Sequence, residues 1–180
     1  LFDVTAVEND RARAAKVHAA VELLLTTGCE KYKAYILENA DFITANMKQL
    51  GWIIARGVKA VDDAAFTAKI TAAMVEFKKE MDELSAETPY GIPYRPHIWG
   101  AGWDIQRLGF QYYFLYKAFP EIFDANFIYN ALNFVLGCHP GTNTASFASG
   151  VLTTESLVVD KPDPAADAAM AAAAQGGGMY

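Results

Sequence analysis

The sequence has few of the residues that several common functions require. Its 180 residues contain only two cysteines and three histidines, and 15 basic residues stand against 21 acidic ones, which gives a net charge of −6. Because Lys and Arg form no basic cluster, we expect no nucleic-acid partner. The histidines and cysteines have no spacing typical of metal ligands, so we expect no metal site. Cys29 and Cys138 are expected to be buried free thiols near helix ends, with a disulfide or a metal pair as the alternative.

Long apolar runs are also missing. Runs such as 21–25, which Glu22 interrupts, and 52–55 are far shorter than the ~20 residues that a membrane-spanning helix needs, so we expect no membrane partner. No signal-peptide pattern opens the chain, and it starts at Leu1 rather than Met, which suggests a mature product or a fragment. The residues themselves leave the localisation open.

What is present is a chain with 53% apolar residues in mainly helical spacing. Apolar residues recur every three or four positions, and capping residues or helix breakers bound each stretch. Connections are mostly short, which favours antiparallel neighbouring helices and an all-α fold. About six helices are predicted: 11–27, 32–39, 42–61, a long one capped by Asp62 or Asp63 and ended at Thr88, one with a stripe from Ile105 to Phe119, and one capped by Asp124 and stopped at Gly137. A β-like pattern appears only from Leu152.

Two long loops, at 89–102 and 137–150, interrupt these helices because Gly and Pro exclude regular structure there. Between Tyr90 and Phe134 lie 14 of the 23 aromatic residues, and several of them are in loop positions, where core packing does not require them. Aromatic faces beside polar groups suit sugar rings, whereas the alternative is that these rings pack the loop onto the helices. The loop residues in question are Tyr90, Tyr94, Trp99 and Trp103, beside Arg95 and His97.

Acidic residues are the main candidates for chemistry. Asp104 lies beside Trp103 and near Trp99, which makes it the best-placed acid for a ligand, although it can equally cap the helix that begins there. Asp62 and Asp63 are adjacent, but their position before a helical stripe is typical of caps. No Ser-His-Asp spacing, phosphate-binding Gly loop or redox Cys pair occurs, so we expect no cofactor.

Two segments resemble the family 9 glycoside hydrolases. The segment 91–106 is similar to a loop that enters a helix in that family. The segment 133–150 contains Leu-Gly-Cys-His139-Pro and then Ser146-Phe-Ala-Ser-Gly, where the family has Leu-Gly-x-Asn-Pro followed by Ser-Tyr-x-x-Gly. His139 therefore stands where the family has Asn. The segment 32–41 also looks like a helical turn of that family.

This resemblance covers residues 1–150 and implies antiparallel helical hairpins that form about half of an (α/α)6 barrel. It implies cellulase-like hydrolysis of β-glucan or a related glycan with inversion, by two carboxyl groups, and thus a role in polysaccharide degradation and carbohydrate metabolism. The family's Asp pair and Glu belong to segments that this sequence does not show, so no catalytic acid is recognisable and only Asp104 is a candidate. We therefore expect the isolated chain to be inactive. The residues implied to line a sugar cleft are Tyr94, Arg95, His97, Trp99, Trp103 and His139.

The resemblance also implies an extracellular or periplasmic location and a missing half barrel or partner chain. Residues 151–180 instead resemble the C-terminus of a group I chaperonin, through Thr-Thr-Glu155, Val-Val-Asp160-Lys-Pro and a tail rich in Ala and Gly. This resemblance implies a strand followed by a mobile tail. The alternative function is therefore a non-enzymatic assembly or chaperonin-type subunit, or the chain is a composite of two genes.

Overall fold

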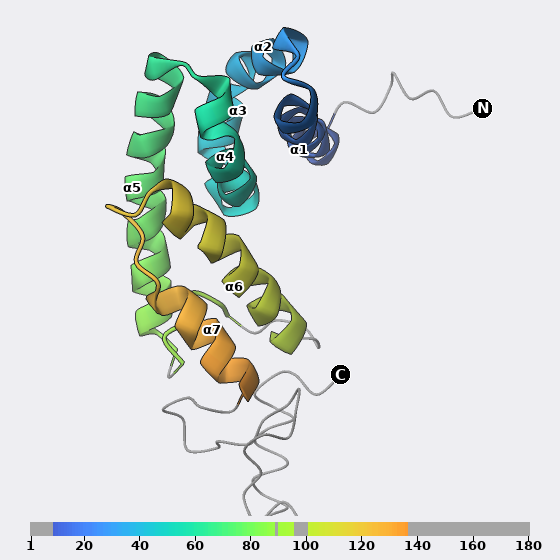
Figure 1. The fold of residues 1–180 in the computed structure, drawn as a ribbon. Coiled ribbons are helices and arrows are strands. Elements are labelled where there is room, and N and C mark those ends of the chain that lie inside the picture. The colour runs from blue at the N-terminus through green and yellow to red at the C-terminus, as the bar shows by residue number, and fades with distance from the viewer. Residues whose placement is uncertain (1–8, 89, 96–100, 137–180) are drawn as a thin grey trace, which may run out of the picture. The chain divides into compact units, whose positions relative to one another are not determined.

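The fold is all-α in the computed structural model, which describes residues 9–88, 90–95 and 101–136. These ranges contain seven helices and no strand (Figure 1). The predicted fold class is confirmed at this level, and the predicted β-like run and tail at 151–180 lie outside the described residues. The helices are α1 Asp10–Thr27, α2 Glu30–Glu38, α3 Ala40–Ala45, α4 Met47–Val61, α5 Ala64–Ala86, α6 Ala101–Ala118 and α7 Asn126–Leu136.

The chain divides into two compact units, which we describe separately. The first comprises Leu1–Lys79 and Phe114–Phe123, and the second comprises Glu80–Tyr113 and Asp124–Tyr180. Helices α5 and α6 therefore contribute residues to both units. In the first unit, α1 packs against α2 and α4, and α3 packs against α4.

Local capping interactions set the ends of α1, as the sequence predicts. The side-chain oxygen of Asn9 accepts a hydrogen bond from the Ala12 backbone N–H at 2.9 Å, which satisfies one of the free donors of the first turn. Gly28 ends the helix with φ of 64°, and its N–H donates to the Leu24 carbonyl oxygen at 2.8 Å. This left-handed conformation costs a glycine little, so the chain can turn at once into α2.

The segment 42–61 is two helices rather than the single helix that we predicted. The break falls at Asn46, whose backbone has φ of −126° and ψ of 38°. Its side-chain amide donates to the Phe42 carbonyl oxygen at 2.8 Å, an oxygen that would otherwise accept a bond of the helical ladder. Asn side chains compete with helix in this way, so α3 ends at Ala45 and α4 begins at Met47.

Helix α4 approaches α1 closely at a glycine. A Cβ atom added to Gly57 would lie 2.7 Å from Cγ1 of Val21, which is inside van der Waals contact. Val21 is fully buried, as are Ile53 and Ile54 on α4. The small residue at 57 therefore permits a helix spacing that any side chain would prevent.

Polar and aromatic side chains make further contacts at the edge of the α1–α4 packing in the first unit. The His18 ring meets Trp52 edge-on with centroids 5.3 Å apart. The Arg56 guanidinium pairs with both carboxylate oxygens of Glu22 and lies 5.1 Å from the centroid of the Phe114 ring. These contacts tie α1, α4 and the last turns of α6 together.

The turn between α4 and α5 explains the adjacent carboxylates. Asp62 ends α4 with φ of 45°, the left-handed conformation, and Asp63 caps α5 by accepting a hydrogen bond from the Phe66 N–H at 2.7 Å. The predicted cap is thus confirmed for Asp63. Asp62 has a different role, because it terminates the preceding helix.

In the second unit, α6 and α7 pack around a small core of Ile92, Ile105, Ala131 and Phe134. Helix α6 begins at Ala101, so the predicted loop ends two residues earlier than expected. The Asp124 side chain accepts a hydrogen bond from the Asn126 N–H at 2.7 Å, which confirms the predicted start of α7.

Cys29 corrects another prediction. It is a free thiol at the start of α2, but it is exposed rather than buried, because the turn between α1 and α2 places it at the surface. Cys138 lies outside the described residues.

Candidate glycan-binding surface at the start of helix α6

The segment 90–95 is anchored within the second unit by contacts to α7. The Asn130 side-chain amide donates to the Gly91 carbonyl oxygen at 2.9 Å. Gly91 has φ of 62°, a conformation that residues with a side chain rarely adopt. An added Cβ would also lie only 2.8 Å from Nδ2 of Asn130, so both the backbone conformation and the space favour glycine. Ile92 is buried, and the Tyr90 ring meets Phe134 edge-on with centroids 5.0 Å apart. The segment is therefore a fixed support.

Thr88 closes the turn that leads into this segment. Its hydroxyl donates to the Ile92 carbonyl oxygen at 3.1 Å, and the Ile92 N–H lies 3.3 Å from the same hydroxyl oxygen. One side chain thus bonds both backbone groups of Ile92, and the Ile92 carbonyl oxygen also accepts a hydrogen bond from the Tyr94 N–H at 2.7 Å. Because the backbone of Ile92 is held in this way, the positions of Tyr94 and Arg95, which follow it closely in the chain, are restricted.

Asp104 is the centre of a hydrogen-bonded cluster. Its Oδ2 accepts from the Tyr94 hydroxyl at 3.2 Å, and its Oδ1 accepts from Nη2 of Arg107 at 2.8 Å. The Asp104 side chain is 23% exposed, whereas that of Arg107 is 66% exposed. Burial raises the pKa of the Tyr94 hydroxyl, and the negative charge of Asp104 raises it further. Tyr94 therefore stays protonated and donates to the carboxylate.

Arg95, which follows Tyr94 in the chain, forms a separate ion pair with Glu87. Its Nε donates to Oε2 of Glu87 at 2.7 Å, and its Nη2 donates to the other carboxylate oxygen. The hydrogen bond and the charge of Glu87 raise the pKa of Arg95 above its usual value. This two-pronged pairing fixes the guanidinium plane.

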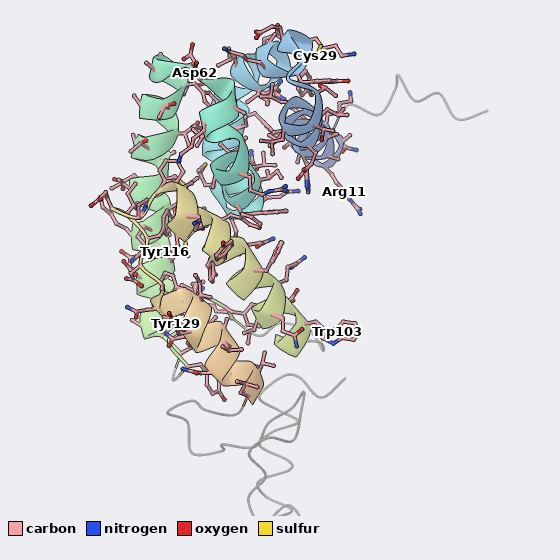
Figure 2. All side chains as sticks on the ribbon, in the orientation of Figure 1. Arg11, Cys29, Asp62, Trp103, Tyr116 and Tyr129 are labelled. Atoms are coloured by element: carbon pink, nitrogen blue, oxygen red, sulfur yellow. The ribbon has the colours of Figure 1, made fainter. Side chains whose placement is uncertain are left out.

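Trp103 is the most exposed large apolar residue among those described, with 66% of its surface accessible. It precedes Asp104 in the first turn of α6 and is labelled at the end of that helix in Figure 2. The first turn of α6 therefore carries an exposed indole one residue before a carboxylate that binds a tyrosine and an arginine. Flat aromatic faces beside such donors and acceptors can bind sugar rings.

The predicted site residues have different outcomes. Tyr94 and Asp104 are joined by a hydrogen bond, Trp103 is exposed one position before Asp104 on α6, and Arg95 is held by Glu87. Asp104 lies within the first turn of α6 and bonds Tyr94 and Arg107, so the alternative reading of Asp104 as the cap at the helix start is wrong. The other predicted residues, His97, Trp99 and His139, lie outside the described residues.

Sequence reasoning missed Arg107 and Asn130. The three-residue spacing between Asp104 and Arg107 on a helix would have indicated their ion pair. No comparable signal exists for Asn130, which reaches Gly91 from 39 positions away. The role of Tyr90 was also open, and the structure places it against Phe134 as packing.

The described residues contain no group of three or more metal-ligating side chains. None of the helices described above is both long and apolar enough to cross a bilayer. Comparison with models of protein families, with curated proteins and with solved structures gave no match.

Proposed function

We propose that this chain is a glycan-binding portion of a helical glycoside hydrolase that acts on β-glucan or a related polysaccharide. The observation that carries the proposal is the exposed indole of Trp103 in the same first turn of α6 that carries Asp104 of the Tyr94–Asp104–Arg107 cluster. The apolar C–H face of a sugar ring would stack on the indole. The hydroxyls of the sugar would exchange hydrogen bonds with the carboxylate and the guanidinium. The resemblance of 91–106 and 133–150 to the family 9 glycoside hydrolases is consistent with this assignment.

The arrangement of the helices is part of the proposal. We propose that they form antiparallel hairpins of a partial (α/α)6 barrel, and that a missing half barrel or partner chain completes the cleft. The short connections at Gly28–Cys29 and Asp62–Asp63, and the packing of α1 on α2, support a hairpin arrangement.

The cluster supports binding better than catalysis. Hydrolysis of a glycosidic bond uses two carboxyl groups that flank the bond, one as acid and one as base or nucleophile. The cluster built on Asp104 contains a single carboxylate, and both of its oxygens already have partners in Tyr94 and Arg107. We therefore propose that the chain by itself binds glycan without turning it over.

Calorimetric titration of the full chain with cello-oligosaccharides tests the binding. Loss of one stacking face, in Trp103→Ala, should cost about 1–2 kcal/mol and weaken binding by roughly 5–30-fold. Tyr129→Ala is the matched control, because Tyr129 is an aromatic residue of α7 with a similar exposed fraction of 60%. It should bind as the unchanged chain does. Equal affinities of Trp103→Ala and the unchanged chain would refute the proposal.

Release of reducing sugar from soluble β-glucan tests the catalytic part. We expect none from the purified chain. Clear turnover that disappears in Asp104→Asn would show that the chain carries its own catalytic machinery, and the binding-only assignment would then be wrong.

A further inference from the structure

A second exposed apolar surface lies along α6 and α7, within the second unit. A groove of about 320 Å³ runs between the two helices, and no charged side chain lines it. Its floor includes Gly109 and Ala131, where the helices come so close that a Cβ added to Gly109 would lie 2.8 Å from Cβ of Ala131. Phe110, Tyr113 and Leu132 form its rims, with exposed fractions of 58%, 46% and 52%.

Trp103 extends this surface along α6. Seven residues make almost two full turns of an α-helix, so Trp103 and Phe110 lie on one face, and Tyr113 lies on the next turn of the same side. We call the surface made by Trp103, Phe110, Tyr113 and Leu132 the aromatic face. The side chains of Phe110 and Leu132 project on either side of the groove. One surface therefore has both ridges and a groove, the two features that fit together when helices pack.

We propose that the aromatic face binds a second copy of this chain in a weak two-fold dimer. A two-fold interface needs one surface that is complementary to itself, and here ridge and groove lie side by side, so the ridge of each copy can enter the groove of the other. This proposal goes beyond the glycan-binding function, because the groove between α6 and α7 carries it, although Trp103 belongs to both surfaces.

The exposed area just reaches the lower limit for such a dimer, so the dimer is expected to be weak. With roughly 200 Å² for a free aromatic side chain and somewhat less for Leu, the exposed fractions leave roughly 430 Å² of apolar surface on the aromatic face. Two copies would bury twice that area, and the partly exposed Ile128 and Val135 of the groove bring the total to roughly 1,000 Å², the lower limit for a specific interface. We therefore expect dissociation in the micromolar range or weaker.

Charge gives the dimer a distinctive dependence on salt. Each copy has a net charge of −6, so two copies repel each other, while the groove itself contributes no charged contact. Added salt screens this repulsion and leaves the apolar contact intact, so dimerisation should strengthen. A basic partner held by charge attraction would dissociate under the same conditions.

Sedimentation equilibrium of the full chain, from about 1 µM to about 1 mM, covers the affinities expected for an interface of this size. The average mass should rise from 19.6 kDa towards twice that value, more steeply at high salt. A chain that stays monomeric throughout would overturn the proposal, and would indicate that its own residues 137–180 or another partner occupy the groove. Dissociation caused by salt would overturn it as well.

Two variants on the aromatic face identify the contact surface. Phe110→Ser and Leu132→Lys should each raise the dimer dissociation constant at least about tenfold, since both change the centre of the interface. Leu25→Lys is the matched control, because Leu25 lies on α1 with 41% of its surface exposed and should dimerise normally. Phe110 and Leu132 are both exposed, so the helical circular dichroism of the two variants should be unchanged. If either variant dimerises like the unchanged chain, or if Leu25→Lys disrupts dimers equally, the aromatic face is not the interface. Trp103 is left unchanged here because it also belongs to the proposed glycan surface.

Discussion

The close approach of α1 and α4 gives a sharp test of the packing in the first unit. Replacing Gly57 by Ala introduces a methyl group 2.7 Å from Cγ1 of Val21, whereas carbon atoms in favourable contact are about 3.5–4.0 Å apart. The two helices would have to separate by about 1 Å, or Val21 would have to leave its rotamer. Val21 is fully buried and β-branched, so it has little freedom to move.

The magnitude follows from two opposing effects. Overpacking a buried contact costs about 1–3 kcal/mol, while Ala is a better helix former than Gly by about 1 kcal/mol. We expect Gly57→Ala to lower the free energy of unfolding by up to about 2 kcal/mol. Gly51 on the same helix supplies the control, because its added Cβ would lie 3.6 Å or more from Met47, Phe77 and Met74. Gly51→Ala should therefore stabilise the chain by about 0.5–1 kcal/mol.

Urea unfolding followed by far-UV circular dichroism measures both changes. Val21→Ala in combination with Gly57→Ala removes the atom that the new methyl group meets, so the double variant should be less destabilised than the two single losses predict. If Gly57→Ala stabilises the chain as much as Gly51→Ala does, the close approach of α4 to α1 at this point is wrong.

Three further predictions concern single side chains. Asp63→Ala removes the cap of α5 and should lower the free energy of unfolding by about 1 kcal/mol in urea titrations, whereas Asp63→Asn should retain most of it. Asn39→Ala leaves Arg13 without the carbonyl oxygen that accepts its Nε–H at 2.7 Å, and should lower the urea midpoint by the equivalent of about 1–3 kcal/mol. Burial raises the pKa of Tyr112 far above its ordinary value of 10.0, so above pH 10 only the unfolded chain loses this proton. Stability should therefore fall as the pH rises past 10, and less steeply in Tyr112→Phe.

The sequence predicts the helices well where a local interaction sets their ends. Asn9, Gly28 and Asp63 act within a few residues of themselves, so their roles can be inferred from their types and positions. The break at Asn46 could not be found in this way. Ile43 and Met47 are both buried and four positions apart, so the apolar stripe continues across the break without interruption. Only the bond from the Asn46 side chain to Phe42 shows that the helix ends.

The candidate site shows the opposite pattern, because its contacts join residues that are distant in the chain. The bond between Tyr94 and Asp104 depends on the path of the intervening loop, and the Asn130 anchor depends on the packing of α7. Sequence alone also left Tyr90 and Trp103 equivalent, as aromatic residues beside Gly and Pro. The structure separates them, since Tyr90 packs on Phe134 and Trp103 is exposed.

Helix α6 shows why the number of aromatic residues is informative here. Its predicted apolar stripe is buried, with Ile105, Tyr112 and Leu115 each 5% exposed or less. That stripe satisfies the need of the helix for a core, yet Trp103 and Phe110 lie on another face and are more than half exposed. Burying such rings against a ligand or a second copy would recover free energy that folding leaves unused. The two proposals share Trp103, but only the dimer uses the groove, so they can be separated because Phe110→Ser should weaken the dimer without weakening glycan binding.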